Sequence, residues 1–583
     1  MDPIRIFRIF RSAFVAMLAV WSASSRSATA DEPGAERMEP STIERVDRLF
    51  VKWDKPTSPG AVLAILKDGK IIYSRGYGLA NLEENVSNAP STVFHLASVS
   101  KQFTAFAIYL LADDGKLSLD DDVRKYIPEL HDFGKTITIR ELLHHTSGIR
   151  DQWNLLALAG WRLDDVITDD DVRRILGQQK ELNFPPGDEM LYSNSGYSML
   201  ALVVRRVSGM PLSRFAKERI FVPLGMTNTH YQTRYGAIVQ NRSYSYVPNQ
   251  DGGYRYIALS YSTIGPSSLF STVADLARWD ENFYTAQIGG NAVLTGLQTK
   301  GKLNNGKEID YASGLVIGRY RGLKTVSHAG ADAGYRTNIL RFPDYHFSVI
   351  VLANAGDLDA DGISLKVADV CLEDKLAPAE KAPDAAYPPI VKNEMKLEPE
   401  ALDAFLGDFE LEPGFVITFT KENGMLFQQA TGQPKFPIFP SSANTFFLKV
   451  VDAEYVFDKA GADGKVHIAA LHQNGRIFPL KRIEQFSLSP DQLRNRKGTY
   501  FSEELGVIYT IREQNENLIV RYPRGDIALK QSGANSFVGE FPVGTLRFSC
   551  DQNDACKGFE IDDGRVRNLK FVKVELPGIT AGP

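Results

Sequence analysis

A proline-rich segment divides this chain of 583 residues into two parts of different character. Between about residues 375 and 400 the composition shifts to alanine, proline, lysine and glutamate, which favours a linker over residues 376–395. Before it, β-like pairs alternate with amphipathic helical patterns, whereas short β-like segments and turns dominate after it. The sequence therefore predicts an α+β domain over residues 31–375, followed by an all-β part.

The first part combines a hairpin, several helices and a late strand. Residues 61–66 and 71–74 are β-like and flank a turn at Asp68-Gly69, as in a β-hairpin. After Ser98 the apolar spacing becomes helical, and residues 348–353 return to a β pattern. Further helices are predicted near residues 137–146, 167–178, 195–208 and 271–284. This order favours terminal strands that share one sheet, with a large helical insertion between them.

The second part contains an internal repeat. Residues 407–420 resemble residues 498–511, an offset of about 91, and residues 475–484 resemble residues 564–575 at an offset of about 89. Each copy is made of β-like segments joined by turns. The repeat predicts two small barrel-like β domains, over residues 396–486 and 487–583.

The first thirty residues have the pattern of a secretory signal peptide. Arg5, Arg8 and Arg11 precede an apolar run over residues 13–21, and Ala28-Thr29-Ala30 supplies a cleavage site. An uncleaved anchor is the alternative, although the run is short for a membrane span. A periplasmic or secreted location is expected.

Charge and hydropathy narrow the expected partners. The chain has 66 basic and 71 acidic residues, a net charge of −5 and an isoelectric point near 6.1, so it has no global positive field for nucleic acid. Its mean hydropathy is −0.20, and no later stretch offers the roughly 20 apolar residues of a membrane span. We expect a small-molecule or peptide substrate, no nucleic acid, and no membrane span after signal removal; the sequence does not indicate the oligomeric state.

The chain has three cysteines. Cys550 and Cys556 flank a turn-rich segment, so a local disulfide is expected in an oxidising compartment. Cys371 lies in an amphipathic helical pattern and is expected to be a buried apolar thiol.

The first motif with catalytic potential is the S-x-x-K sequence Ser98-Val99-Ser100-Lys101. On a helix, residues i and i+3 share a face, so the Lys101 amine can approach the Ser98 hydroxyl. The positive end of the helix dipole would favour a developing oxyanion there. A Ser–Lys nucleophile pair is the functional interpretation, and a helix cap with a surface lysine is the alternative.

Two further motifs follow in order. A segment over residues 184–187 leads to Tyr192-Ser193-Asn194, and His328-Ala329-Gly330 comes before the last β-like segments. Together with Ser98 and Lys101, these motifs resemble the penicillin-recognising serine hydrolases, a family of class C β-lactamases, D-Ala-D-Ala carboxypeptidases, D-aminopeptidases and esterases. The resemblance covers about residues 40–375. It implies a β-lactamase/transpeptidase-like α+β fold, in which helices flank an antiparallel sheet.

The resemblance also implies roles for individual residues. Ser98 would be the acylated nucleophile, Lys101 its activating partner, and Tyr192 a proton shuttle that faces Lys101, with His328 as a further neighbour. Asn194 would bind the substrate, and the backbone at Gly330 and Ala331 would join the Ser98 N–H in an oxyanion hole. No cofactor and no metal are expected, and the identity of the general base stays open.

His328 departs from the lysine that many family members carry. A histidine is only partly charged near neutral pH, so it should hold a substrate carboxylate more weakly. The resemblance associates this H-x-G motif with D-aminopeptidases, esterases and amidases, so it implies a serine hydrolase that cleaves amide bonds of small or linear peptides, with peptides that contain D-residues among the candidates. An esterase or β-lactamase with the same acyl-enzyme is the first alternative, and a non-catalytic peptide- or cell-wall-binding protein is the second.

For several other residues the sequence indicates a structural role or a place in the lining of the pocket. His144 and His145 are adjacent and lack a metal-binding motif, so they are expected in a structural loop, and His95 is expected in the wall of the pocket. Candidates for an aromatic lining are Trp153, Trp161, Tyr244 and Tyr261. The two β domains would either cover the mouth of the active site and limit substrate length, or act as wall-binding or stability modules.

Overall fold

The computed structural model describes residues 38–249, 251–260, 262–378, 394–412, 415–430, 435–449, 453–473, 476–483, 488–515 and 517–575. The predicted signal peptide lies outside these residues, as does most of the predicted linker. In the described part, every helix is too short or too polar to cross a membrane.

One antiparallel sheet organises the α+β domain. Its strands follow the order β10-β11-β12-β13-β1-β2. Their bounds are β1 (Ala61–Lys67), β2 (Lys70–Tyr77), β10 (Val316–Tyr320), β11 (Leu323–Asp332), β12 (Tyr335–Phe342) and β13 (Phe347–Ala353). The register pairs Ala61 of β1 with Ala353 of β13, so the first hairpin and the late strand lie side by side as predicted.

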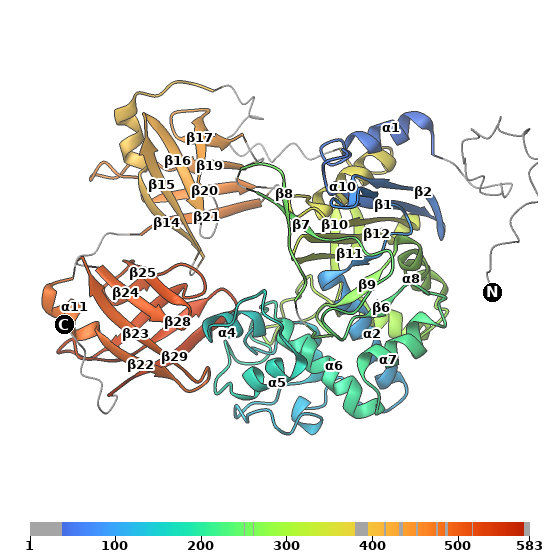
Figure 1. Ribbon diagram of the computed structural model, residues 1–583, viewed down its shortest axis with the longest axis horizontal. Helices are drawn as coiled ribbons and strands as arrows, with labels where there is room; N and C mark the ends of the chain where they lie inside the picture. The colour runs from blue at the N-terminus through green and yellow to red at the C-terminus, as the bar shows by residue number, and fades with distance from the viewer. Residues whose placement is uncertain are drawn as a thin grey trace, which may run out of the picture. The chain divides into compact units, whose positions relative to one another are not determined.

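The sheet separates two hydrophobic cores. Because side chains alternate along a strand, Val62, Ala64 and Leu66 of β1 face one core, while the intervening residues face the other. The first core contains α2 (Lys101–Asp113) and most of the helical insertion. The second is covered by α1 (Pro40–Arg48) and α10 (Ala360–Cys371), which Figure 1 shows beside the sheet.

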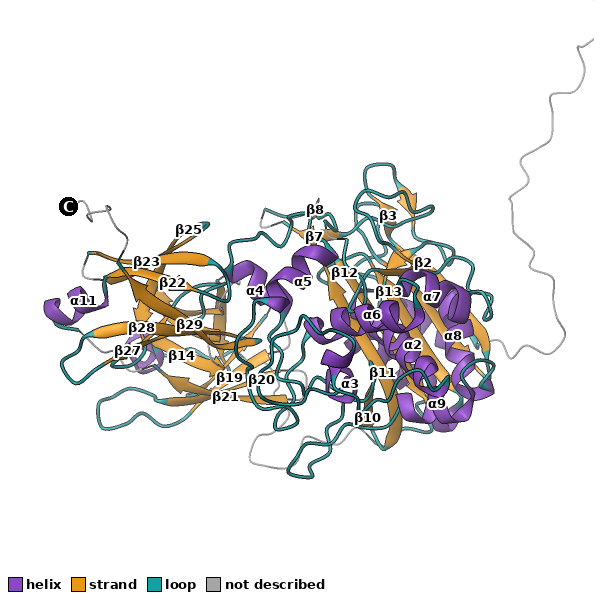
Figure 2. Cartoon of the chain, turned by 90° about the horizontal axis from the view of Figure 1, so that it is seen from below, coloured by secondary structure: helices purple, strands orange, loops and turns teal. Residues whose placement is uncertain are grey.

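The helical insertion lies between β2 and β10, as expected, and Figure 2 shows its helices against the sheet. Its helices are α3 (Ile139–Leu143), α4 (Gln152–Leu158), α5 (Asp169–Gly177), α6 (Asn194–Ser208), α7 (Leu212–Ala216), α8 (Val273–Thr285) and α9 (Gly290–Leu297). The chain between β2 and β10 also forms the short strands β3 (Leu79–Asn81), β4 (Val86–Ser87), β5 (Phe94–His95), β6 (His230–Tyr231), β7 (Tyr246–Pro248), β8 (Tyr254–Tyr256) and β9 (Leu269–Ser271). Local sequence fixes several helix starts, because Thr138 and Thr168 form capping boxes with the acidic residue three positions on.

The repeat folds into two closed antiparallel barrels of eight strands each, drawn in orange and red in Figure 1. The first consists of β14 (Gly407–Glu412), β15 (Phe415–Glu422), β16 (Met425–Ala430), β17 (Phe436–Pro440), β18 (Thr445–Leu448), β19 (Ala453–Phe457), β20 (Ile468–Gln473) and β21 (Arg476–Arg482). The second follows α11 (Pro490–Arg496) and consists of β22 (Gly498–Ser502), β23 (Val507–Gln514), β24 (Asn517–Tyr522), β25 (Gly525–Gln531), β26 (Ser536–Val538), β27 (Thr545–Cys550), β28 (Cys556–Asp563) and β29 (Val566–Val574). Closure pairs the first strand of each barrel with its last, so neither barrel has a free edge strand.

The second barrel packs directly on the α+β domain. Its buried apolar side chains join the core that contains α2, whereas the first barrel has a core of its own. The hydroxyl of Tyr509 in β23 donates a hydrogen bond to the carbonyl of Leu158 in α4, at 2.7 Å. This continuity favours a stable position for the second barrel next to the helical insertion.

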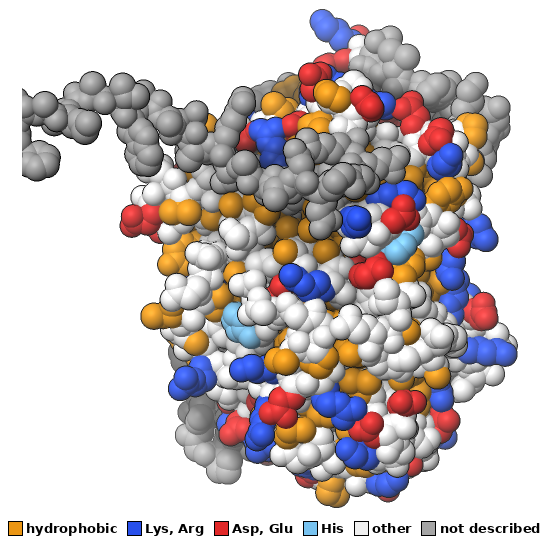
Figure 3. Space-filling view, turned by 90° about the vertical axis from the view of Figure 1, so that its right-hand side faces the viewer, with side chains coloured by type: hydrophobic (Ala, Val, Ile, Leu, Met, Phe, Trp, Pro, Cys, Tyr) orange, Lys and Arg blue, Asp and Glu red, His pale blue; other side chains and the backbone are white. Residues whose placement is uncertain are grey.

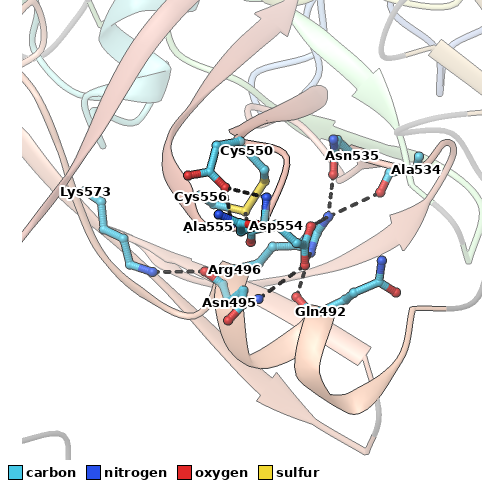
Figure 4. Close-up of a disulfide and its surroundings, with 12 residues drawn as sticks. Gln492, Asn495, Arg496, Ala534, Asn535, Cys550, Asp554, Ala555, Cys556 and Lys573 are labelled. Atoms are coloured by element: carbon cyan, nitrogen blue, oxygen red, sulfur yellow. Dashed lines mark hydrogen bonds and ion pairs between the residues drawn. A yellow bond between two sulfur atoms is a disulfide. The ribbon is translucent and has the colours of Figure 1, made fainter.

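The predicted disulfide between Cys550 and Cys556 is present, and it joins β27 to β28 (Figure 4). Arg496, at the end of α11, donates hydrogen bonds to Asp554 in the enclosed turn. The disulfide and this ion pair therefore fix the turn against α11. Cys371 lies in the last turn of α10 and packs against the margin of the second core, so the expected buried thiol is covered only in part.

The surface has no strong separation of charge on the face drawn in Figure 3. Basic and acidic side chains alternate there instead of gathering by sign. This mixture agrees with the small net charge of the whole chain.

Candidate active site

Ser98 and Lys101 lie at the junction between β5 and α2. Ser98 belongs to a 3₁₀ turn (Ala97–Ser100), and α2 begins at Lys101, so Ser98 precedes the α-helix by one turn. Ala97 adopts a left-handed conformation with φ of 49°, which turns the chain sharply before Ser98. The Lys101 amine lies 3.2 Å from the Ser98 hydroxyl, and Ser98 is partly accessible while Lys101 is fully buried.

The surroundings of Lys101 are compatible with an uncharged amine, and its burial favours one. Its nitrogen lies 2.9 Å from the side-chain oxygen of Asn194 and 2.9 Å from the carbonyl of Pro266, and both of these atoms only accept hydrogen bonds. A neutral amine can donate its two N–H groups to them and direct its lone pair at Ser98. Burial lowers the pKa of Lys101 well below its ordinary value; Asp151 opposes this shift and Arg565 adds to it.

Tyr192, just before α6, lies beside this pair. Its ring centroid is 4.7 Å from the Lys101 nitrogen, and its phenol shares a hydrogen bond with Ser98. Burial raises the pKa of Tyr192, so the phenol stays protonated at neutral pH and can donate a proton. His145 packs against the ring at 4.3 Å between centroids and accepts a hydrogen bond from the Ser193 N–H, which fixes the approach to α6.

Asp151 orients Asn194. One oxygen of its buried carboxylate accepts hydrogen bonds from the Asn194 backbone N–H at 2.7 Å and from the side-chain amide at 2.9 Å. The amide nitrogen of Asn194 is thereby held on Asp151, and the amide oxygen faces Lys101. Asp151 is also the N-cap of α4, which was the only role that its sequence context would indicate.

His328 lies in the pocket wall on β11, but it has partners other than Tyr192. Its Nε2 lies 3.0 Å from the Tyr311 hydroxyl and its Nδ1 lies 2.6 Å from the carbonyl of Ala329. A neutral ring satisfies both contacts, with Nδ1–H as donor and Nε2 as acceptor. Burial lowers the pKa of His328 to about 3, so it carries no charge near neutral pH.

β11 approaches Ser98 closely. It is the second strand of the sheet, and its pairing with β10 ends at Ser327. Gly330 makes the approach possible, because a Cβ there would lie 2.5 Å from the carbonyl of Leu96 and 2.3 Å from the Thr337 hydroxyl. Gly330 and Ala331 therefore border the same space as Ser98.

These groups open into a cavity of about 930 Å³. Most predicted site residues line it, namely Ser98, Tyr192, Asn194, His328, Gly330 and Ala331, and Trp153 contributes an aromatic wall. Lys101 lies behind Ser98 and outside the lining. Trp161 and Tyr244 do not line it, His95 is buried against Ser268, and Tyr261 is outside the described residues.

The second barrel also reaches this cavity. Arg565, in the turn between β28 and β29, lines it. Its backbone carbonyl accepts hydrogen bonds from the Asp151 N–H at 3.2 Å and from the Asn183 side chain at 2.9 Å. No pattern in the sequence indicates that this turn lies at the cavity, because its partners are more than 350 positions away.

Asp332 gives the cavity a pH-dependent charge. It accepts a hydrogen bond from the Ser267 hydroxyl at 3.1 Å, and burial raises its pKa to about 7. In an unfolded chain an aspartate titrates near pH 3.9. The folded protein thus holds this proton more tightly, and stability is lost as the pH rises from about 4 to about 7.

Replacing Asp332 with asparagine should therefore stabilise the protein at pH 8. We expect a gain of about 1 to 2 kcal/mol, less than the full shift implies because the carboxyl is partly open to the cavity. Denaturant unfolding at pH 8 and pH 4.5 measures this gain, which should shrink at the lower pH. Asp310→Asn, at an exposed position, is the control; an equal effect of Asp332→Asn at both pH values would contradict the prediction.

Comparisons with known proteins assign this chain to a family. The family described as Beta-lactamase matches residues 46–371. Penicillin-binding protein 4* of Bacillus subtilis (strain 168) is 30% identical over 414 residues, which cover 68% of this chain and 89% of that protein. D-aminopeptidase of Gluconobacter oxydans (strain 621H) is 26% identical over 296 residues, covering 51% of this chain and 56% of that protein.

Solved structures share the fold. A penicillin-binding protein homologue from Pyrococcus abyssi, described as octameric, matches with a TM-score of 0.52 at 21% identity, over 83% of this chain and 98% of that one. D-amino acid amidase from Ochrobactrum anthropi SV3 matches with a TM-score of 0.50 at 20% identity, over 57% of this chain and 98% of that one. The fold prediction is confirmed: a β-lactamase/transpeptidase-like α+β domain precedes two barrels.

Proposed function

Because the chain belongs to the Beta-lactamase family of serine hydrolases, we propose that it cleaves amide bonds of small or linear peptides through an acyl-enzyme on Ser98. One observation carries this proposal. The nitrogen of a fully buried lysine lies 2.9 Å from each of two fixed acceptors and 3.2 Å from the hydroxyl of a partly accessible serine. Such a pair is the arrangement that activates a serine nucleophile.

Acylation uses each of the neighbouring groups. Lys101 accepts the Ser98 proton while the Ser98 oxygen attacks the carbonyl carbon of the scissile amide. The backbone N–H groups of Ser98 and Ala331 stabilise the oxyanion that forms. The C–N bond then breaks, and Tyr192 gives its proton to the departing amine and regains one from Lys101. Water attacks the resulting ester by the reverse proton path and releases the acid.

The neutral state of His328 and the related proteins both support the proposed substrate class. His328 is neutral, so the position where many family members carry a lysine supplies no cation for a substrate carboxylate. The relatives include a D-aminopeptidase, which supports peptides with D-residues as substrates. We place the protein in the periplasm or outside the cell, on the strength of the signal-like first thirty residues. The second barrel at the cavity supports a role in limiting substrate length.

A substrate panel tests this proposal. The purified protein is assayed with D- and L-amino-acid amides, short peptides, p-nitrophenyl esters and nitrocefin, and kcat/KM is compared across classes. We expect the amides and short peptides to have the highest values. The Ser98→Ala variant, prepared identically, measures contaminating hydrolases. Turnover of nitrocefin or of esters alone would contradict the peptide assignment, and equal turnover by Ser98→Ala would contradict the enzyme assignment.

A further inference from the structure

Besides Lys101, a cation from the second barrel lies against the ring of Tyr192. The guanidinium of Arg565 lies 4.9 Å from the centroid of the Tyr192 ring and 3.9 Å from the Asp151 carboxylate. The Lys101 nitrogen lies 4.7 Å from the same ring centroid. Tyr192 therefore has two basic groups against its ring, one from each part of the molecule.

The barrel turn holds Arg565 in this place through bonds on both sides of it. The side chain of Asn154 donates to the carbonyl of Asp563 at 3.1 Å. Beyond Arg565, the Arg567 N–H donates to the Asn183 side chain at 2.8 Å, and Arg150 donates to the carbonyls of Arg567 and Asn568. The backbone of Arg565 itself is bonded to Asp151 and Asn183. Contacts between the second barrel and the α+β domain therefore fix the position of Arg565 at the cavity.

The charges around Lys101 indicate how Arg565 affects the protonation of the Lys101 amine. Two carboxyl groups, Asp151 and Asp332, favour a protonated amine, and Arg565 is the positive charge that opposes them. The other titratable groups that face Lys101 and Tyr192 come from the 3₁₀ turn, the loop before α4, α6, the loop before β10 and β11; they are Ser98, His145, Tyr197, Tyr311 and His328. Burial keeps the imidazoles of His145 and His328 neutral, and it raises the pKa of the two phenols.

We propose that Arg565 is a positioning residue that the second barrel supplies to the catalytic centre: it offsets the charge of Asp151 and keeps Lys101 as the free amine that accepts the Ser98 proton. This inference rests on the proposed function, since it presumes that Ser98 is acylated. It gives the second barrel a part in catalysis that is separate from any contact with substrate.

The test is the pH dependence of Ser98 phosphonylation by a small, neutral fluorophosphonate, which has no carboxylate for Arg565 to bind; the Ser98 oxygen bonds to phosphorus and fluoride leaves. In Arg565→Met the acid limb of the second-order rate constant should move up by about 0.5 to 1 pH unit, because the loss of the guanidinium charge makes Lys101 easier to protonate. Below the midpoint, phosphonylation should slow by about 3- to 10-fold relative to wild type, and on the alkaline plateau the two rates should converge.

Three further variants sharpen this test. Arg565→Lys keeps the charge and should restore most of the wild-type profile. Arg567→Met is the matched control, because Arg567 lies two residues further on, at the start of β29, but pairs with Glu189 and does not line the cavity. Asp151→Asn removes the opposing charge, so its midpoint should move down even though its rate falls with the loss of Asn194 positioning.

An unchanged midpoint in Arg565→Met would overturn the inference, whatever happens to the KM for peptide substrates. So would an equal shift in Arg567→Met. If wild type itself is not labelled at any pH, the proposed function fails as well, so the two failures are distinguishable. Circular dichroism of each variant verifies that a slower rate does not reflect unfolding.

Discussion

Replacing Lys101 with methionine is expected to lower kcat/KM by at least about 10³-fold, because the variant loses the group that accepts the Ser98 proton. Methionine is similar in length and apolar, so it can occupy the fully buried position of the lysine stem. It leaves the acceptors on Asn194 and Pro266 without their donor, which adds a modest cost in stability. Steady-state assays on the best substrate of the panel measure the loss.

Two variants accompany Lys101→Met: one keeps a positive charge without a usable base, and the other is a surface control. Lys101→Arg retains a basic side chain, but a guanidinium does not release its proton at working pH, so this variant should also be inactive. Lys125→Met removes an exposed lysine that pairs with Asp121 on the surface, and it should behave as wild type. Near-normal activity in Lys101→Met would contradict the assignment of Lys101 as the base.

Loss of Arg150 should produce the largest fall in stability. Its side chain is fully buried at the interface with the second barrel and lies 2.5 Å from Glu504, which is also buried. Arg150→Met leaves the Glu504 carboxylate buried without its cation and removes the bonds to the 567–568 carbonyls. We expect a destabilisation of about 3 to 5 kcal/mol, visible as a lower midpoint of thermal or denaturant unfolding.

The paired variant distinguishes a buried charge from a packing defect. Arg150→Met combined with Glu504→Leu removes both charges, so it should recover much of the stability that the single variant loses. Arg512→Met is the control, because Arg512 and Asp526 form an exposed pair in the same barrel and should contribute less than about 1 kcal/mol. An Arg150→Met midpoint that matches the control would show that the interface does not depend on this pair.

Short-range patterns in the sequence predicted much of this molecule. The Ser98–Lys101 contact follows from helical spacing, and the first hairpin follows from two β-like segments around Asp68-Gly69. The internal repeat indicated two similar β domains, and closure into barrels is how such repeated strands avoid free edges. Tyr192 and His328 were predicted only through the family resemblance, because nothing local brings them to Ser98.

The remaining features depend on contacts that no local pattern contains. Asp151 has the sequence context of a helix cap, and its bond to Asn194 exists only because α6 begins beside it. The Gly564-Arg565 pair fits a hairpin turn, but its place against Tyr192 is set by the packing of the second barrel. His145 lies in a loop, as predicted, but its packing against the Tyr192 ring, with a left-handed backbone at φ of 60°, is not evident from the sequence. Likewise, the neutrality of His328 follows from Tyr311 and burial, which the sequence does not reveal.

The most direct test of this account is to find the residue that becomes covalently modified. Wild-type protein and Ser98→Ala are incubated with a reactive fluorophosphonate, and intact mass and peptide mapping locate the adduct. The account predicts one adduct per chain, on the peptide that contains Ser98, and none on the variant. An unmodified wild-type chain, or an adduct on another residue that persists in Ser98→Ala, would contradict it.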